Sequence, residues 1–213
     1  MKKIISFSLY GNQHKYLVGM LCNAELSKKI YPDWIVRVYY GESVPNEYIE
    51  KLLCYEHVEL IKMEENSKYQ YMMWRFLPIS DEDVEIMISR DADSRLSYRE
   101  KKLVDIFEKS DYLLHSIRDN ISHNNIMGGM WGIKKNDRIN MKNLVESWDG
   151  HLGYDSDQSF LRQIINPHFE DSCLTHCSNY LNNFPFPPDP SGYFIGGWWY
   201  EDNFGKPHDY VFF

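Results

Sequence analysis

The chain has few cysteines, no long apolar run and no excess of positive charge. Its 213 residues include only four cysteines, and Cys173, His176 and Cys177 lack the second ligand pair at regular spacing that structural zinc needs. No apolar run approaches the roughly 20 residues that span a bilayer. The formal charge of −8 argues against nucleic acid or an anionic membrane surface as the main partner.

Targeting and phosphate-loop motifs are missing as well. The apolar N-terminal run is interrupted by serines and ends at Gly11 without a small-residue cleavage site, so we expect a buried first strand rather than a signal peptide. The turn at 10–14 lacks the Gly-x-Gly-x-x-Gly fingerprint, and the chain has no Gly-Lys-Ser/Thr loop. We therefore expect a cytoplasmic protein that uses no dinucleotide cofactor.

Strand and helix patterns alternate along most of the chain, and aromatic residues make up 15% of it. The predicted strands are 3–9, 34–40, 57–63, 84–90, 111–118 and 125–134, and the predicted helices are 14–30, 45–55, 68–77, 97–109, 137–148 and 156–165. Repeated strand–helix units followed by mixed strands predict a three-layer α/β sandwich with a largely parallel sheet. The pattern breaks down after Pro167 into an aromatic C-terminal segment.

Asp91 and Asp93 follow a buried apolar strand, whereas two other Asp-x-Asp pairs lie in contexts typical of a turn (81–83) and a helix start (155–157). Alternate residues of an extended chain point to the same side. Two carboxylates at the carboxyl end of a buried strand suit Mg²⁺ or Mn²⁺, which keep positions open for phosphate oxygens. We therefore predict a site for a metal and a diphosphate, with Arg90 and Arg95 as candidates to contact phosphate.

Three further features point toward the same site. Arg75 lies among aromatic residues, and a buried arginine needs a carboxylate partner, for which Asp157 is the candidate. Gly128 and Gly129 permit close approach of the backbone to a ligand, or else form a strand bulge. The alternative to a role of Asp157 at the site is that it caps the N-terminus of the helix predicted at 156–165.

Six ordered motifs together resemble the GT-A fold glycosyltransferases, in particular the small glycosyltransferase domains of large algal DNA viruses and their bacterial relatives. The motifs lie at 6–12, 23–34, 74–78, 90–96, 127–132 and 157–161. The resemblance implies one domain over 1–213, with a nucleotide- and metal-binding half at 1–96 and a donor-sugar and acceptor half at 97–213. Further domains of a longer polypeptide are compatible with it, and a viral relative would act in the host cytoplasm.

The resemblance also implies roles for individual residues. Asp93 would coordinate Mn²⁺ or Mg²⁺ directly, and Asp91 would share the metal or hold the ribose. Arg75, the two glycines, Asp157 and Gln158 would surround the donor sugar, with Asp157 also a candidate base toward the acceptor. The remaining expected positions are Leu9, Tyr10 and Tyr40 around the base, His176 or His208 as a third metal ligand, and Asp119 and His123 toward the acceptor.

The expected function is metal-dependent transfer of a sugar from a UDP-sugar to a hydroxyl of a glycan or glycoprotein. Retention of anomeric configuration is favoured because Gln158, rather than a second carboxylate, follows Asp157. The alternatives are a haloacid-dehalogenase-like phosphatase, a non-catalytic sugar-nucleotide or glycan-binding module, and a sugar nucleotidyltransferase. The phosphatase class places its acidic pair after the first strand, and the nucleotidyltransferases need a Gly-rich loop there.

Overall fold

A computed structural model describes residues 1–65, 69–120, 122–123, 125–150, 153–178, 186 and 194–197. The strands are β1 (Lys2–Leu9), β2 (Ile35–Tyr40), β3 (Val58–Lys62), β4 (Val84–Arg90), β5 (Leu114–Arg118), β6 (Met130–Lys134) and β7 (Cys173–Cys177). The α-helices are α1 (His14–Ile30), α2 (Asn46–Leu53), α3 (Tyr98–Lys109), α4 (Met141–Glu146), α5 (Ser156–Phe160) and α6 (Asn166–His168). The other helical segments are η1 (Tyr69–Ser80), η2 (Leu161–Ile165) and η3 (Glu170–Ser172).

The strands form one seven-stranded sheet in the order β3-β2-β1-β4-β6-β5-β7. All neighbouring pairs are parallel except those that β6 makes with β4 and β5. Strands from both sides of position 96 therefore belong to one sheet. The sheet order reverses beside β1 and β4, and their carboxyl ends open on the same edge, where open α/β sheets bind ligands.

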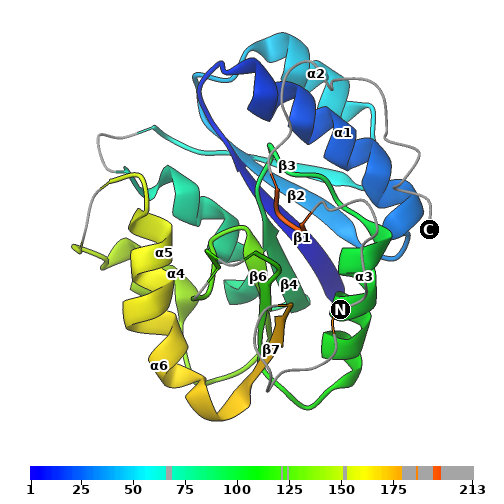
Figure 1. Ribbon diagram of the computed structural model, residues 1–213. Coiled ribbons are helices and arrows are strands. Elements are labelled where there is room, and N and C mark those ends of the chain that lie inside the picture. Colours follow the sequence, from blue (N-terminus) through cyan, green and yellow to red (C-terminus); the bar gives the residue numbers. More distant parts are fainter. Residues whose placement is uncertain are drawn as a thin grey trace.

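Two helical layers cover the sheet, as predicted (Figure 1). The apolar core on one face joins α1, α2 and α3 to alternate strand residues such as Ile5 and Ile88. The core on the other face joins η1, α4, α5 and η2 to the intervening residues, such as Ile4 and Met87. Because side chains alternate between the faces of a strand, these apolar strands are buried on both sides.

The predicted helix before β4 is present, but as a 3₁₀ helix rather than the commoner α-helix. Met73, Phe76 and Ile79 recur every third residue and enter one core, which suits three residues per turn. Met72 and Arg75 share the same spacing on a second face and line a cleft. The 3₁₀ geometry therefore separates a face that enters the core from a face that lines the cleft.

Strand β7 is a second departure from the sequence prediction. It pairs in parallel with β5 at the edge of the sheet, although its five residues, Cys173–Cys177, show no long apolar pattern.

The predicted helix start at Ser97 is confirmed, since the Ser97 hydroxyl accepts the Glu100 amide at 3.1 Å. Within the residues described, no helix is long and apolar enough to cross a membrane.

Candidate functional site

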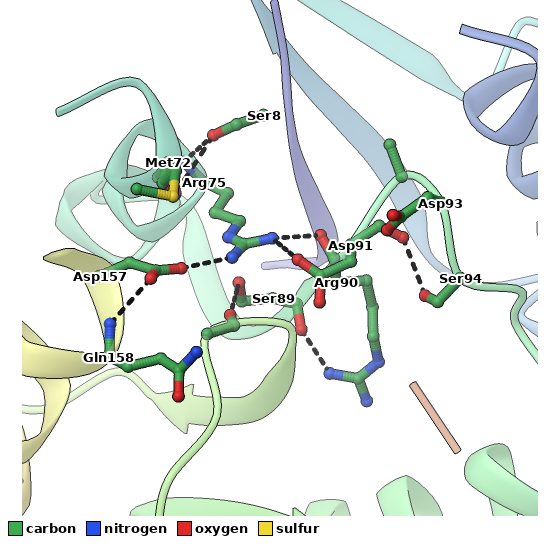
Figure 2. A network of polar contacts seen from close by, with 12 residues as sticks. Ser8, Met72, Arg75, Ser89, Arg90, Asp91, Asp93, Ser94, Asp157 and Gln158 are labelled. Atoms are coloured by element: carbon green, nitrogen blue, oxygen red, sulfur yellow. Dashed lines mark hydrogen bonds and ion pairs between the residues drawn. The ribbon is translucent and has the colours of Figure 1, made fainter. Parts of the chain in front are cut away.

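A cleft of about 840 Å³ opens at the carboxyl ends of β1 and β4. Segments that are far apart in sequence line it, and Figure 2 shows part of its polar network. They include the end of β1 (Ser8) and the following Tyr10, the start of α1 (Gln13, Lys15, Tyr16), η1 (Met72, Arg75), the 91–93 turn, the turn with Gly128 and Gly129, and the start of α5 (Asp157, Gln158). The acidic pair, the arginine, the glycines and the Asp157–Gln158 pair predicted from the sequence therefore meet in one cleft.

Arg75 is the centre of the polar network in this cleft (Figure 2). Its Nη2 donates to Asp157 Oδ2 at 2.7 Å, and its Nη1 pairs with Asp91 and donates to the Arg90 carbonyl at 3.0 Å. The side chains of Arg75 and Asp157 are only 7% and 5% exposed. The predicted Arg75–Asp157 pair is confirmed, although 82 residues separate the two.

The surroundings of these buried charges act on their pKa values in opposite directions. Burial opposes the charge of Arg75, but Asp91 and Asp157 outweigh it and raise the pKa of the guanidinium. Burial raises the pKa of Asp157, and the positive charge of Arg75 opposes that rise. The second oxygen of Asp157 accepts the Gln158 amide at 2.8 Å. Both oxygens of Asp157 therefore have donors, which favours the ionised form.

Gly128 and Gly129 leave room for the two carboxylates of this network. A Cβ on Gly128 would lie 2.1 Å from Asp157 Oδ2, and a Cβ on Gly129 would lie 2.0 Å from Asp91 Oδ2. Any side chain at either position would force these carboxylates to move. The close approach that these glycines permit here is to acidic side chains of the chain itself, and approach to a ligand stays a prediction.

Lys15 is a site residue that the sequence analysis missed. Its Nζ lies 2.8 Å from Asp93 Oδ2, and the two side chains are 25% and 14% exposed. Burial disfavours the lysine charge, but the hydrogen bond with Asp93 outweighs it and raises the pKa of Lys15. A lysine in the first turn of a helix opposes the helix dipole, and this anomaly is the signal that could have identified it.

Of the three residues expected around a base, only Tyr10 is among the described residues that line the cleft. Its ring packs against Tyr71 and Trp74, with centroids 5.4 and 6.3 Å away. Burial raises the pKa of Tyr10 to about 12, so the phenol stays neutral. Leu9 is buried in the core below α1, and Tyr40 packs against that same core, which corrects the expectation for both.

Arg90 does not have the position expected of a phosphate ligand. Its side chain is buried, and its Nε donates to Glu100 at 2.7 Å while its Nη1 donates to the carbonyls of Ser89 and Trp131. The Glu100 carboxylate, which also accepts the Tyr31 hydroxyl, holds this arginine beneath α3. The pair is part of the core and does not line the cleft.

His176 lies far from the acidic pair. It lies on β7, three strands from β4 in the sheet order, which corresponds to about 14 Å at the usual strand spacing. Its Nδ1 lies 2.8 Å from His115 Nε2 in the interior. His176 is therefore not a ligand of a metal held by Asp91 and Asp93. The other candidate, His208, and most of the aromatic C-terminal segment lie outside the described residues.

Asp91 and Asp93 nevertheless offer a donor set that suits a hard divalent cation. Both carboxylates face the cleft, and the Asp91 side chain is 40% exposed. Within the described residues, no cluster of three or more His, Cys, Asp or Glu side chains that could hold a metal is present. Mg²⁺ typically takes one or two protein carboxylates and keeps its other positions for water and phosphate oxygens. The residues present fit a cation that binds together with a diphosphate.

The comparisons with known proteins match this architecture at low sequence identity. No protein-family model and no curated protein matches the chain. Among solved structures, S. aureus TarS 1–349 in complex with UDP is similar with a TM-score of 0.57 and 13% identity, over 84% of this chain and 59% of that one.

Two further solved structures are also similar over most of the chain at low sequence identity. A Desulfovibrio desulfuricans G20 protein described as a nucleotide-diphospho-sugar transferase aligns with a TM-score of 0.54 and 11% identity, over 83% of this chain and 80% of that one. The 4-diphosphocytidyl-2C-methyl-D-erythritol synthase of Anaerococcus prevotii DSM 20548 aligns with a TM-score of 0.51 and 9% identity, over 84% and 88%. These similarities show the fold, which is the mixed, mostly parallel sheet of the GT-A nucleotide-diphospho-sugar transferases.

Proposed function

We propose that this chain is a metal-dependent glycosyltransferase that moves a sugar from a UDP-sugar to a hydroxyl of a glycan or glycoprotein. The observation that carries the proposal is the network in which Arg75 joins Asp91 to the buried Asp157, in a cleft that also contains Asp93. A metal-binding pair and a buried carboxylate held by one arginine suit a donor with a charged diphosphate and a neutral sugar.

The diphosphate end of the donor would lie at the 91–93 turn. Asp91 and Asp93 would hold Mn²⁺ or Mg²⁺, which neutralises charge on the leaving diphosphate. Three carboxylates (Asp91, Asp93, Asp157) and two cations (Arg75, Lys15) face the cleft, so its fixed charge is about −1. A diphosphate would be repelled without a cation, and Lys15 beside Asp93 adds a second positive group.

The sugar would lie between Asp157 and the glycine turn. Arg75 fixes the position and the charge of Asp157, so this carboxylate is available to accept sugar hydroxyls or to stabilise positive charge at the anomeric carbon. Gln158 follows it and also lines the cleft. With an amide there in place of a second carboxylate, we propose that the configuration at the anomeric carbon is retained.

The nucleobase would pack on the aromatic group formed by Tyr10, Tyr71 and Trp74. Because Tyr10 remains a neutral phenol, it can stack on a base and donate a hydrogen bond to a uracil carbonyl. The same group provides apolar surface beside the charged half of the cleft.

Product analysis tests this proposal. The protein is incubated with a panel of UDP-sugars and Mn²⁺, and released or transferred sugar is identified by mass spectrometry, with the anomeric configuration read by NMR. We expect metal-dependent consumption of one UDP-sugar, and inverted product would refute retention. Phosphate release from simple monoesters with no use of UDP-sugars would indicate a phosphatase, and binding without turnover would indicate a binding module.

A further inference from the structure

Part of the cleft lining carries no formal charge and has a different chemistry from the acidic turn. This wall contains His123, Met127 and Phe194. Phe194 belongs to the short described stretch 194–197, 71 positions after His123, and the two rings meet edge to face with centroids 5.5 Å apart. An apolar surface with a single imidazole suits a ligand that carries hydroxyls and no charge.

His123 contributes a buried polar atom to this wall. The side chain is about nine-tenths buried, at 8% exposure, and its Nδ1 has no hydrogen-bond partner among the described residues. A buried polar atom without a hydrogen-bond partner destabilises the folded state. Such atoms are usually satisfied by a ligand or a water molecule. Burial lowers the pKa of His123, so the imidazole is neutral near pH 7 and offers one accepting and one donating nitrogen.

A separate set of contacts holds the Phe194 side of the wall in place. The Ile195 amide donates to Asp119 Oδ2 at 2.9 Å, and the same carboxylate pairs with Arg99. The Ile195 side chain is buried against Leu103, Ile117 and Met130. Asp119, which was expected to face the acceptor, is therefore occupied in anchoring this segment, and His123 is left as the polar group.

From this geometry we propose that His123 and Phe194 form the acceptor subsite, in which the imidazole hydrogen-bonds an acceptor hydroxyl and the phenyl ring packs on an uncharged sugar. The proposal rests on the proposed function, because it assigns the uncharged part of the same cleft to the second substrate. His123 is a positioning residue for the hydroxyl, and the wall favours neutral pyranosides over anionic acceptors.

Imidazole NMR of the histidine-labelled protein tests the assignment. Methyl α- and β-glycopyranosides of glucose, galactose and mannose, and one methyl glucuronide, are titrated into the protein with Mg²⁺ and UDP. We expect at least one neutral glycoside to shift the His123 Nδ1 resonance, assigned by its loss in His123→Asn. In His123→Ala and in Phe194→Ala the glycoside should bind about tenfold more weakly. The first variant loses one hydrogen bond to the glycoside, and the second loses one ring contact with it.

Binding of UDP with Mg²⁺ is measured separately by calorimetry in all variants and in the control His168→Gln on α6. If no variant or wild-type protein binds UDP, the proposed function fails. If UDP binds normally but none of the neutral glycosides shifts His123, or both alanine variants bind the glycoside as wild type does, the acceptor assignment is overturned. A stronger response to the glucuronide would also contradict it.

Discussion

The buried Arg75–Asp157 pair should make a large and non-additive contribution to stability. In Arg75→Met, Asp157 loses the cation that lies 2.7 Å away, while its side chain stays only 5% exposed. Breaking a buried ion pair by removing one partner typically costs about 3–5 kcal/mol, because a charge is left buried without compensation. Asp91 adds little to that cost, since its side chain is 40% exposed and can be hydrated.

The reciprocal change should cost less. In Asp157→Asn, Arg75 keeps Asp91 and the Arg90 carbonyl as partners, and the amide oxygen can still accept a hydrogen bond. We expect a loss of about 1–2 kcal/mol. In the double variant no uncompensated charge remains at 157, so its total cost should be smaller than the sum of the single costs by about 1–3 kcal/mol.

Urea unfolding followed by tryptophan fluorescence, in the presence of EDTA, provides the four free energies of this cycle. The matched control is Arg138→Met, because Arg138 and Asp171 form an exposed pair on the surface and exposed pairs typically contribute under 1 kcal/mol. The reasoning is refuted if Arg75→Met costs no more than the control, or if the two substitutions at the network are additive.

Three further predictions concern single sites. Gly129→Ala should weaken Mn²⁺ binding by more than about tenfold, because the new Cβ would lie 2.0 Å from Asp91 Oδ2. Electron paramagnetic resonance measures the binding. As a control, Gly41→Ala places a Cβ against the carboxylate of Glu65, away from the cleft, and should leave Mn²⁺ binding intact. Lys15→Met should strengthen Mn²⁺ binding severalfold, since the lysine competes with the metal for the Asp93 carboxylate. The same variant should bind UDP more weakly in the presence of Mn²⁺. If Mn²⁺ affinity and UDP affinity both rise or both fall, the prediction is contradicted.

The third prediction concerns pH. Burial lowers the pKa of His176 to about 4, so the unfolded chain binds the proton more readily between pH ~6.5 and ~4. The unfolding free energy should be level above pH ~6.5 and fall by about 3 kcal/mol toward pH 4. Urea titrations at several pH values measure the slope. His176→Gln should reduce it and leave the part that comes from His115, whose pKa burial also lowers; an unchanged slope in that variant would contradict the prediction.

Most of the fold could be predicted because its pattern is local. The first strand, the long first helix and the capped third helix follow from apolar spacing and the Ser97 cap, and they agree with β1, α1 and α3. The type of the helix before β4 could not be predicted, because residues three positions apart share one face in an α-helix as well as in a 3₁₀ helix. Strand β7 was missed because its five residues are stabilised by pairing with β5, which no local pattern contains.

The site was predictable where its chemistry depends on residue type, and unpredictable where it depends on direction. Arg75 and Asp157 could be paired because buried charges require partners. Arg90 and Asp91 are adjacent, yet one enters the core and the other the cleft, and only the positions of α3 and η1 decide which. Lys15 was overlooked because its role comes from the proximity of the α1 start to the 91–93 turn.

The most direct test of the central proposal is calorimetric binding of a UDP-sugar panel with Mn²⁺, repeated with EDTA and with Asp93→Ala. The exposed acidic turn offers Asp83→Ala as a matched control, since Asp83 pairs with Lys2 away from the cleft. We expect that one UDP-sugar binds only with Mn²⁺, and that binding is lost in Asp93→Ala and kept in Asp83→Ala. Failure of every nucleotide to bind with Mn²⁺ present, or equal binding by Asp93→Ala, would contradict it.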